Sequence, residues 1–273
     1  MQTIQISVII STYNSFEWLT KVLWGYNEQT FKNFEVVIAD DGSKEETING
    51  IKEIKKSLDF PVQHIWHEDK GFQKSQILNK AILATKGDYI IMSDGDCIPR
   101  EDFVAVHNKF KNIGCFLSGG YFMLPMQTSK AITKEDIKSG NCFTIKWLKE
   151  NGLKKSSKNK KLTSNGFKSI LLNFITPTKA TWNGHNASGW KKDIVAVNGF
   201  DERMQYGGQD RELGERLKNY GIKSKQIRYN AIVIHLDHKR GYANEESWKI
   251  NNSIRKTTRK TKKTYTKYGI KKG

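Results

Sequence analysis

The sequence predicts an α/β protein with a mostly parallel, Rossmann-like central sheet flanked by helices. Two observations support this fold class. Short runs of β-branched and aromatic residues alternate with helical patterns in the first part of the chain, as expected of repeated strand–helix–strand units. Each run also ends in acidic, polar or glycine residues. Because ligands of open α/β sheets bind beyond the carboxyl ends of the strands, we expect a ligand site along that edge.

Each expected element rests on a local pattern. Four runs have the length and composition of buried strands: 6–10, 34–39, 61–66 and 88–93. Helical patterns cover the segments between them: about 16–28, 45–58 and 74–85. Ser43 is expected to cap the second of these helices. Regular patterns return in the second half: 190–197, 211–220 and 231–234.

Lysine is concentrated in two regions. The segment 127–179 holds twelve lysines against three acids, and the segment after Gly241 holds ten Lys or Arg against two acids. We expect the first to form insertions and mobile loops around a short helix near 143–149, and the second to form a basic tail. The net charge of the whole chain, +18, predicts an anionic partner: a nucleotide, a nucleic acid or an anionic lipid.

The composition excludes several classes of protein. Hydrophobic residues make up 37% of the chain and aromatic residues 11%, which is more than a disordered chain carries. Three widely spaced cysteines without a CxxC pair indicate a reducing compartment. No signal-peptide pattern surrounds the apolar run at 4–10, and no window holds the ~18 apolar residues of a membrane span. We therefore expect a cytoplasmic protein, either soluble or peripheral on the inner face of the cell membrane.

Asp94-Gly95-Asp96 follows the fourth expected strand and is the most informative motif. Two carboxylates two residues apart can share one divalent cation, which often bridges to substrate phosphates. A solvated Asp-Gly turn explains this triplet alone equally well. The strand expected at 231–234 leads to His235 and His238, and either can bind a metal through a ring nitrogen. A histidine at such a place is more often only hydrogen-bonded.

Polar loops also follow the second and third strands. Asp40 and Asp41 can accept hydrogen bonds from a ribose or a base, although a helix cap would explain them too. Gly71 permits close approach of the backbone to a ligand, and Lys70 and Lys74 can face phosphate. A polar loop before a helix is the simpler interpretation of each of these residues taken singly.

The run Tyr206-Gly207-Gly208-Gln209-Asp210-Arg211-Glu212 precedes a helical pattern. Its glycines allow the loop to fold tightly against a ligand. Asp210 is expected at the helix N-terminus, where the helix dipole favours its ionised form. A carboxylate at that place can deprotonate an acceptor hydroxyl, whereas a simple helix cap is the alternative.

Together these motifs resemble family 2 glycosyltransferases with the GT-A fold. The second half is similar to the C-terminal domain shared by β-1,4-galactosyltransferases and bacterial chondroitin-type polymerases. The resemblance covers roughly residues 4–125 and 180–240. Eight motifs occur in the family's order: Ser11-Thr12-Tyr13-Asn14, Asp40-Asp41-Gly42-Ser43, Gly71-Phe72, Leu78-Asn79, Asp94-Gly95-Asp96, Asn186-Ala187-Ser188, Asn198-Gly199-Phe200-Asp201 and Gly207-Gly208-Gln209-Asp210.

The resemblance implies roles for the matched residues. Thr12, Tyr13 and Asp41 would hold uracil and ribose. Lys74 would approach the donor phosphates, and Asp94 would contact the ribose or the donor sugar. The remaining implied donor contacts are Asn14, Asp40, Lys70, Gly71, Asn79 and Gly95.

The resemblance also implies a metal site, a base and an acceptor site. Asp96 and His235 would bind Mn²⁺ or Mg²⁺, with His238 as the alternative to His235. Asp210 would be the catalytic base, and Tyr206 would pack on the sugars. The remaining implied acceptor contacts are Asn186, Gly207, Gly208, Gln209 and Arg211. Two positions depart from the family pattern: Gln209 is usually Glu, and Gln73 is often Arg, so phosphate neutralisation would depend more on Lys70 and Lys74.

The implied function is inverting, metal-dependent transfer of a sugar from a nucleotide diphosphate, expected to be UDP, to a carbohydrate hydroxyl in surface polysaccharide or lipopolysaccharide synthesis. A nucleotide-sugar-binding half (1–115) would precede an acceptor-binding and catalytic half that contains the Lys-rich insertion (116–240). The basic tail (241–273) could dock on an anionic membrane surface, near a lipid-linked or oligosaccharide acceptor, although a solvated tail is nearly as good an interpretation.

Two other functions compete with this one. A metal-dependent phosphatase or nucleotidyltransferase could use the same Asp-x-Asp, but an aspartyl nucleophile usually follows the first strand, which here ends in Ser11-Thr12-Tyr13-Asn14. A basic nucleic-acid-binding protein would suit the net charge of +18, but no nucleic-acid-binding motif is recognisable, so no nucleic acid is expected as a partner. Metal-dependent hydrolysis of a sugar nucleotide would separate the three functions.

Overall fold

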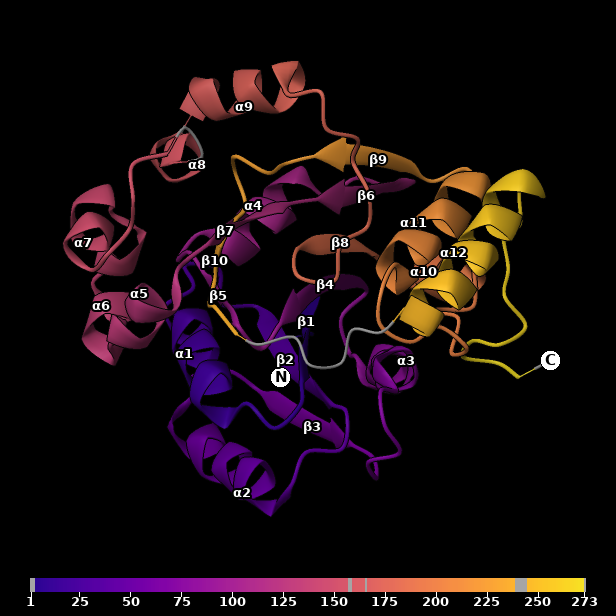
Figure 1. The fold of residues 1–273 in the computed structure, drawn as a ribbon, viewed down its shortest axis with the longest axis horizontal. Coiled ribbons are helices and arrows are strands. Elements are labelled where there is room, and N and C mark those ends of the chain that lie inside the picture. Colours follow the sequence, from indigo (N-terminus) through magenta and orange to yellow (C-terminus); the bar gives the residue numbers. More distant parts are fainter. Residues whose placement is uncertain (1–2, 157–158, 165, 239–244, 273) are drawn as a thin grey trace.

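The computed structural model describes residues 3–156, 159–164, 166–238 and 245–272. Its centre is a seven-stranded sheet with the order β3-β2-β1-β4-β8-β6-β9, and a second sheet has the order β5-β10-β7 (Figure 1). The strands are β1 (Ile6–Thr12), β2 (Phe34–Asp40), β3 (Val62–Trp66), β4 (Tyr89–Asp94), β5 (Cys97–Pro99), β6 (Cys115–Ser118), β7 (Gly120–Met123), β8 (Ala187–Trp190), β9 (Lys223–Gln226) and β10 (Ile232–His235).

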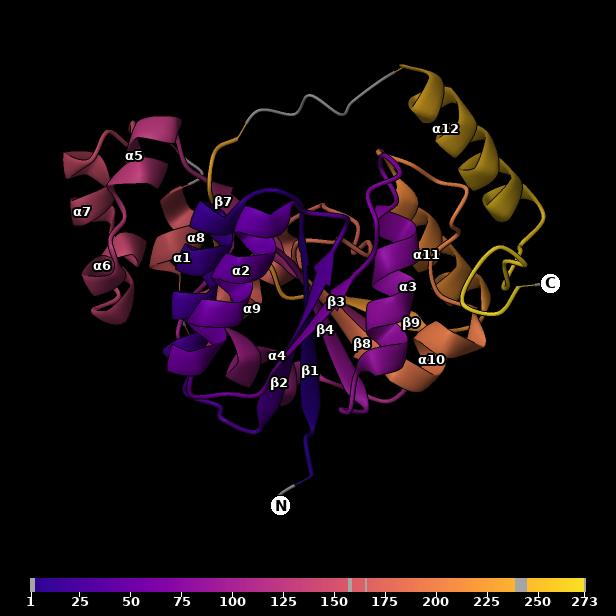
Figure 2. The same ribbon diagram turned by 90° about the horizontal axis from the view of Figure 1, so that it is seen from below.

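The helices cover both faces of the large sheet (Figure 2). They are α1 (Phe16–Asn27), α2 (Glu45–Ile54), α3 (Lys74–Ala84), α4 (Phe103–Phe110), α5 (Met126–Ala131), α6 (Lys134–Lys138), α7 (Ile145–Glu150), α8 (Lys160–Thr163), α9 (Gly166–Ile175), α10 (Lys191–Ala196), α11 (Gln209–Asn219) and α12 (Glu245–Lys260). Two short 3₁₀ turns span Lys55–Ser57 and Asn141–Phe143.

The alternation of side chains along β1 explains this layering. Successive residues of a strand point to opposite faces of the sheet. Val8 and Ile10 therefore enter one core cluster, which includes α1 side chains such as Leu19, while Ile9 enters the other, which includes α3 side chains such as Ile77. Strand β1 pairs in parallel with both β2 and β4, and the two clusters bury its two faces, which explains why it is rich in Ile and Val with only short polar residues between them.

The expected α/β fold class is confirmed. Strands β1 to β4 and helices α1 to α3 lie where the first half of the sequence predicted them, and β10, α10 and α11 lie where regular patterns return. The four N-terminal strands are parallel, whereas β8 runs antiparallel to its two neighbours, β4 and β6. One detail was wrong: the residue that precedes α2 is Lys44, with no side-chain cap. The hydroxyl of Ser43 instead accepts a hydrogen bond from the Asn14 N–H.

The Lys-rich segment is largely helical, which corrects the expectation of mobile loops. Helix α7 lies at the expected place, but α5, α6, α8 and α9 flank it. Ile137, Cys142 and Leu148 are buried in the same core cluster as the side chains of α1. These few apolar residues anchor the segment, while most lysines between them remain at the surface. The many lysines obscured the helical spacing of the apolar residues in the sequence.

The alternative interpretation of the basic tail, a solvated segment, does not hold for the described residues 245–272. Helix α12 packs against α11, where Thr258 donates a hydrogen bond from its hydroxyl to Glu212 (2.8 Å) and Arg255 forms an ion pair with Glu215 (2.6 Å). Thr266 and Asn251 are buried. Residues 245–272 are therefore part of the second half, and the expected boundary at 240 and 241 lies outside the described residues.

Candidate active site

Strand β4 ends at Asp94, which therefore lies at the edge of the sheet where the parallel strands end. Its Oδ1 accepts hydrogen bonds from the Ser11 hydroxyl (2.6 Å) and from the Lys74 ammonium (2.7 Å). Burial alone would favour the neutral acid, but these two partners hold the pKa of Asp94 well below its usual range. Asp94 and Lys74 thus form a charged pair from β4 and the first residue of α3, as expected for residues at one shared edge.

The next residue turns the chain sharply. The Gly95 N–H donates to the Ser11 carbonyl (2.8 Å), and a Cβ at this position would lie 3.0 Å from that same oxygen. A larger residue would push the turn away from β1. Gly95 therefore determines where the following carboxylate, Asp96, is placed, and Asp96 faces β10 of the second sheet.

Asp96 lies between two histidines. Its Oδ2 is 2.9 Å from His238 Nε2, and its Oδ1 is 3.7 Å from His235 Nε2. The Nδ1 of His235 is 2.8 Å from the Leu236 carbonyl, which can only accept, so Nδ1 carries a proton and Nε2 is the ring nitrogen on the side of Asp96. The two imidazole rings are stacked at 5.5 Å between centroids.

These residues fit a divalent cation. Ligand atoms of Asp96, Cys97 and His235 all lie within 4.8 Å of one another. Burial and the neighbouring carboxylates raise the pKa of the Cys97 thiol well above its usual value, and hard cations such as Mg²⁺ and Mn²⁺ prefer oxygen and nitrogen ligands to sulfur. The available donors are then a carboxylate and imidazole nitrogens. The structure places Asp96 and His235, the metal ligands that the resemblance implies, close to each other, and His238 lies beside both.

Asp210 lies at the start of α11, as the sequence predicted. The preceding Gly208 has a φ of +89°, which allows the loop to turn into the helix. The Oδ1 of Asp210 is buried and has no hydrogen-bond partner among the described residues. Gly184 lies against this carboxylate so closely that a Cβ there would be 2.9 Å from Oδ1. The unpartnered oxygen can accept a proton from a substrate hydroxyl.

The protonation behaviour of Asp210 differs from the expectation. The helix N-terminus was expected to favour the ionised form, but burial raises the pKa of Asp210 to about 6, even though the nearby Lys74 ammonium opposes this shift. The charge of Asp94 adds to the increase, and Arg211 opposes it. A carboxylate with a pKa near 6 is a better proton acceptor close to neutral pH than an ordinary aspartate.

A pH dependence follows from this pKa. Asp210 is deprotonated above pH about 6 and protonated below it, so we expect kcat/KM to fall about tenfold for each pH unit below that value. Initial rates at saturating metal between pH 5 and 8 would measure the profile. The Asp210→Asn variant should lose this acidic limb. An unchanged limb in that variant would assign it to another group.

Several implied donor residues are linked into one loop network. Asp41 accepts from the Gln73 N–H (3.0 Å) and lies 2.8 Å from His67 Nε2. Tyr13 is half-exposed and donates to Asp69 (2.8 Å), and the side chain of Asn14 accepts from the Lys44 N–H (2.8 Å). The buried hydroxyl of Thr12 has no partner among the described residues, so it can bond a ligand.

Other implied site residues have structural partners instead. Asn79 is buried and bonds the Phe200 backbone through its amide oxygen and nitrogen. Asn186 is fully buried and donates to the Gly120 and Ala231 carbonyls, so it ties strands together and cannot reach an acceptor. Asp40 is likewise fully buried, bonded to Ser43 N and His64. Because these three side chains are buried and already hydrogen-bonded to the protein, we assign them a structural role and leave them out of the proposed ligand contacts.

Two basic residues and one glycine of the implied set lie at the surface. The Lys70 ammonium pairs with Glu68 (3.2 Å), and both side chains are about two-thirds exposed or more. Arg211 is exposed on α11. Gly71 has a φ of +81° and open space around it, in agreement with the expected close approach of a ligand. Phosphate neutralisation by Lys70 would thus require its side chain to exchange partners.

The implied acceptor side is a loop lined by aromatic rings. Tyr206 packs edge-to-face against Phe72 (6.0 Å) and against Trp248 of α12 (6.1 Å). A Cβ at Gly207 would lie 2.8 Å from the Trp248 indole, so the loop needs glycine here. Gln209 is buried, and its side-chain oxygen accepts from the Gly207 N–H (3.0 Å). Gln209 therefore uses its side-chain oxygen to stabilise its own loop. That oxygen is the atom that the expected acceptor contact would have needed.

Two residues of this region were missed by the sequence analysis. His185 packs its ring against Tyr121 (4.7 Å), which also contacts His235, and burial lowers the pKa of His185 to about 4 despite the nearby charge of Asp94. His185 is thus a neutral imidazole beside the acidic cluster. The sequence could have indicated His185, because it lies in Asn183-Gly184-His185-Asn186, directly before Asn186, which the resemblance placed in the acceptor site. Trp248 had no local signal, because its position depends on how α12 packs.

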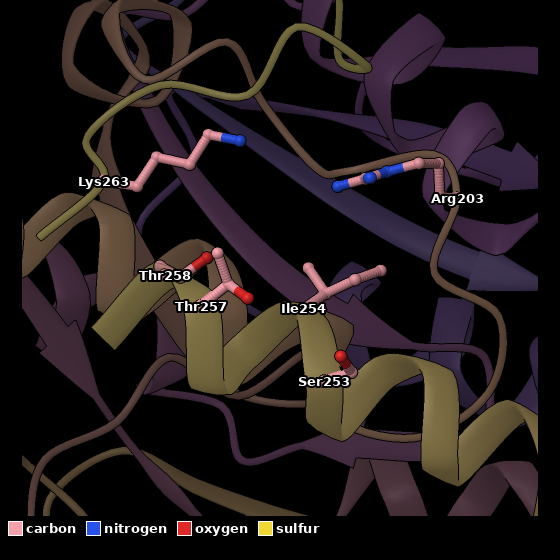
Figure 3. Close-up of a pocket in the computed structure, with 6 residues that line it drawn as sticks. All are labelled: Arg203, Ser253, Ile254, Thr257, Thr258 and Lys263. Carbon is pink, nitrogen blue, oxygen red and sulfur yellow. The ribbon is translucent and has the colours of Figure 1, made fainter. Parts of the chain in front are cut away.

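A cavity of about 210 Å³ lies elsewhere, between α12, Arg203 of the segment before α11 and Lys263 of the segment after α12 (Figure 3). Its lining residues are Arg203, Ser253, Ile254, Thr257, Thr258 and Lys263. It contains no carboxylate or imidazole and none of the residues around Asp96 and Asp210. The candidate active site at the sheet edge is therefore separate from this cavity.

Comparison with solved structures defines the class of the fold. A mannosyltransferase, PcManGT from Pyrobaculum calidifontis, in complex with GDP-Man and Mn²⁺, matches with a TM-score of 0.55 at 18% identity, covering 91% of this chain and 61% of that one. S. aureus TarS 1–349 with UDP-GlcNAc matches with a TM-score of 0.59 at 16% identity, covering 92% and 65%. The chain has the GT-A fold of these glycosyltransferases.

Sequence comparison then gives the family. Residues 7–110 match the model of glycosyl transferase family 2, so the chain carries a family 2 glycosyltransferase domain. An uncharacterized glycosyltransferase, YfnE, of Bacillus subtilis is 28% identical over 85% of this chain and 64% of its own length. A chondroitin synthase of Escherichia coli is 26% identical over 81% of this chain and 33% of its own length. The chain spans less than two thirds of each of these relatives.

Proposed function

We propose that the chain is an inverting, metal-dependent glycosyltransferase that moves a sugar from a nucleotide diphosphate to a carbohydrate hydroxyl. The observation that carries this proposal is the buried, unpartnered oxygen of Asp210 with a pKa near 6, close enough to the Asp94–Lys74 pair for their charges to affect that pKa. A proton acceptor and a site for a charged donor are thus held side by side.

The donor would lie along the carboxyl ends of β1, β2 and β4. Thr12, Tyr13 and Asp41 are the proposed contacts of the base and ribose, and Lys74 can leave Asp94 to contact the diphosphate. UDP is the proposed nucleotide, supported by the UDP-GlcNAc complex of TarS. The GDP-Man complex of PcManGT makes GDP the competing choice.

The metal would be held by Asp96 with His235, His238 or both, and Mn²⁺ is proposed because PcManGT was solved with this ion. When bound, a divalent cation offsets the charge that develops on a leaving diphosphate. The net negative charge of Asp94 and Asp96 is balanced by Lys74 and by such a cation.

The proposed chemistry is a single displacement. The acceptor hydroxyl gives its proton to Asp210 Oδ1 while its oxygen bonds to the anomeric carbon from the face opposite the diphosphate. The bond between that carbon and the phosphate oxygen breaks, and the nucleoside diphosphate leaves with the electron pair. Attack from the opposite face inverts the configuration. Because little covalent catalysis is needed, positioning and electrostatics supply most of the rate gain.

The acceptor would rest on the aromatic rings beside this base. Trp248 is 42% exposed and packs on Tyr206, so one face of its indole can stack on a sugar ring. We expect Trp248→Ala to raise KM for the acceptor roughly tenfold or more, with KM for the donor unchanged and partial recovery in Trp248→Phe. Tyr220→Ala, at another half-exposed aromatic outside the site, is the matched control.

The synthesis of a surface polysaccharide or lipopolysaccharide is the proposed setting, supported by the similarity to chondroitin synthase. A cytoplasmic location, or one at the inner face of the membrane, is proposed because Cys97, Cys115 and Cys142 are all unpaired. None of the helices within the described ranges has the length and apolar character needed to cross a membrane.

Screening sugar nucleotides for metal-dependent release of free nucleoside diphosphate tests the proposed function. Release with one or a few donors, stimulated by a carbohydrate acceptor and abolished by chelator, would support it. Hydrolysis of phosphate monoesters in place of sugar nucleotides would favour the phosphatase, and transfer of a nucleotidyl group would favour the nucleotidyltransferase. Sugar transfer with retained anomeric configuration would overturn the inverting mechanism and the role of Asp210.

A further inference from the structure

Helix α9 exposes an apolar face to solvent. Five large side chains on this helix are exposed: Phe167 (79%), Ile170 (54%), Leu171 (45%), Phe174 (88%) and Ile175 (58%). Their spacing places them on one stripe of the helix, within an arc of roughly 140° at 100° per residue. An exposed cluster of this kind marks an interaction site, whereas scattered single apolar residues do not.

The polar side of the same helix faces the protein. Ser169 is buried. Asn173 donates from its amide to Asn230 (2.5 Å), and its amide oxygen accepts from the Tyr229 N–H (3.1 Å). Thr176, just past the helix, is 3.4 Å from the Tyr229 hydroxyl. A helix that packed only for stability would bury its apolar stripe, so this reversed orientation indicates an apolar partner outside the chain.

The surroundings of α9 are strongly basic. Between Glu150 and Asp193 the sequence contains no acidic residue, and the described lysines on or near the helix include Lys160, Lys168 and Lys179, all exposed. Figure 1 shows α9 at the rim of the molecule, next to α8. A second copy of this chain would bring an equally basic surface against this one and would be repelled. An anionic lipid surface would be attracted, by ~1 kcal/mol for each Lys or Arg near it.

We propose that the outer face of α9, formed by Phe167, Ile170, Leu171, Phe174 and Ile175, inserts into the interfacial layer of an anionic bilayer while the neighbouring lysines contact the lipid headgroups. Two features act together, because an apolar stripe alone or charge alone gives weak binding. This inference goes beyond the proposed function and does not depend on it. It also moves the membrane contact from the expected basic tail, which packs on α11, to the Lys-rich segment.

Co-sedimentation of the full chain with vesicles tests the proposal without any turnover. We expect binding to vesicles of equal parts phosphatidylcholine and phosphatidylglycerol, weaker binding as salt rises, and little binding to phosphatidylcholine alone. The double variant Phe167→Ser/Phe174→Ser should lower partitioning by roughly tenfold or more. The matched control, Leu83→Ser/Ile113→Ser, removes two other exposed apolar side chains and should bind as the unmodified chain does.

Three outcomes would overturn the proposal. Equal binding of the double variant and the unmodified chain would mean that lysines alone hold the surface, without insertion. Absence of vesicle binding by the unmodified chain would exclude a lipid partner. Concentration-dependent dimers in sedimentation velocity, lost in the double variant, together with absent vesicle binding would assign this face to a second copy. Photolabelling of the unmodified chain by a reagent dissolved in the lipid, mapped to residues 166–175, tests insertion without any substitution.

Discussion

Replacement of Asp96 by asparagine is expected to reduce metal-dependent donor turnover to background. Asparagine keeps the size of the side chain but removes the negative charge that a divalent cation needs, and His235 and His238 would then lack the carboxylate that lies near both of their Nε2 atoms. Release of free nucleoside diphosphate with Mn²⁺ and with chelator would measure the loss, and titration calorimetry would show weaker Mn²⁺ binding.

The control for this prediction is Asp88→Asn, an exposed aspartate before β4 that lies outside the site. Unfolding temperatures of both variants should remain close to that of the unmodified chain. Full activity of Asp96→Asn in the presence of chelator would reject the metal site. Separate His235→Ala and His238→Ala variants would then decide which imidazole contributes more to Mn²⁺ affinity.

Replacement of Asp210 by asparagine is expected to lower kcat on the order of a hundredfold or more, as for the loss of a general base. Asparagine fills the same space beside Gly184 but cannot take the acceptor's proton. The dissociation constant of the donor should hardly change, because the donor contacts lie on β1, β2 and β4. Single-turnover rates with saturating donor, together with donor titrations, measure both quantities.

Asp193→Asn is a suitable control, because burial also raises the pKa of this carboxyl but it lies on α10, outside the site. If the Asp210→Asn variant transfers sugar at the rate of the unmodified chain, the base must be another residue. The neighbouring Glu212 is not that alternative, although its position in the sequence suggests it. Glu212 is buried, forms an ion pair with Arg216 (2.7 Å) and accepts from Thr258, so none of its oxygens can reach a substrate.

The first half of the fold could be predicted because its signals are local. A buried parallel strand such as β1 is a continuous apolar run, and the residues that end it mark the sheet edge whatever the rest of the chain does. The same logic correctly brought Asp94, Lys74 and Asp96 together. Their separate strands and helices end at one edge in any open α/β sheet.

The errors arose where the environment of a side chain depends on distant segments. Asn79 and Asn186 belong to motifs, but an amide can bind a ligand or tie strands together, and only packing distinguishes these roles. Asp210 stands at a helix N-terminus, yet its burial, which depends on the packing of distant segments, raises its pKa to about 6. The basic tail was misjudged because its anchors are small polar residues, Asn251, Thr258 and Thr266, hidden among lysines.

The packing of residues 245–272 has a consequence for how the site forms. Thr258 bonds Glu212 across 46 positions, Thr266 bonds Asp201 across 65, and the Lys271 N–H bonds Asn198 across 73. Asn251 also bonds the Gly207 carbonyl across 44 positions and so holds the loop before Asp210. A chain made from its N-terminus emerges from the ribosome with the donor half first. The loop before Asp210, the proposed base, gains its supports only after α12 has been synthesised, so the sheet formed by β1 to β4 can fold before Asp210 is positioned.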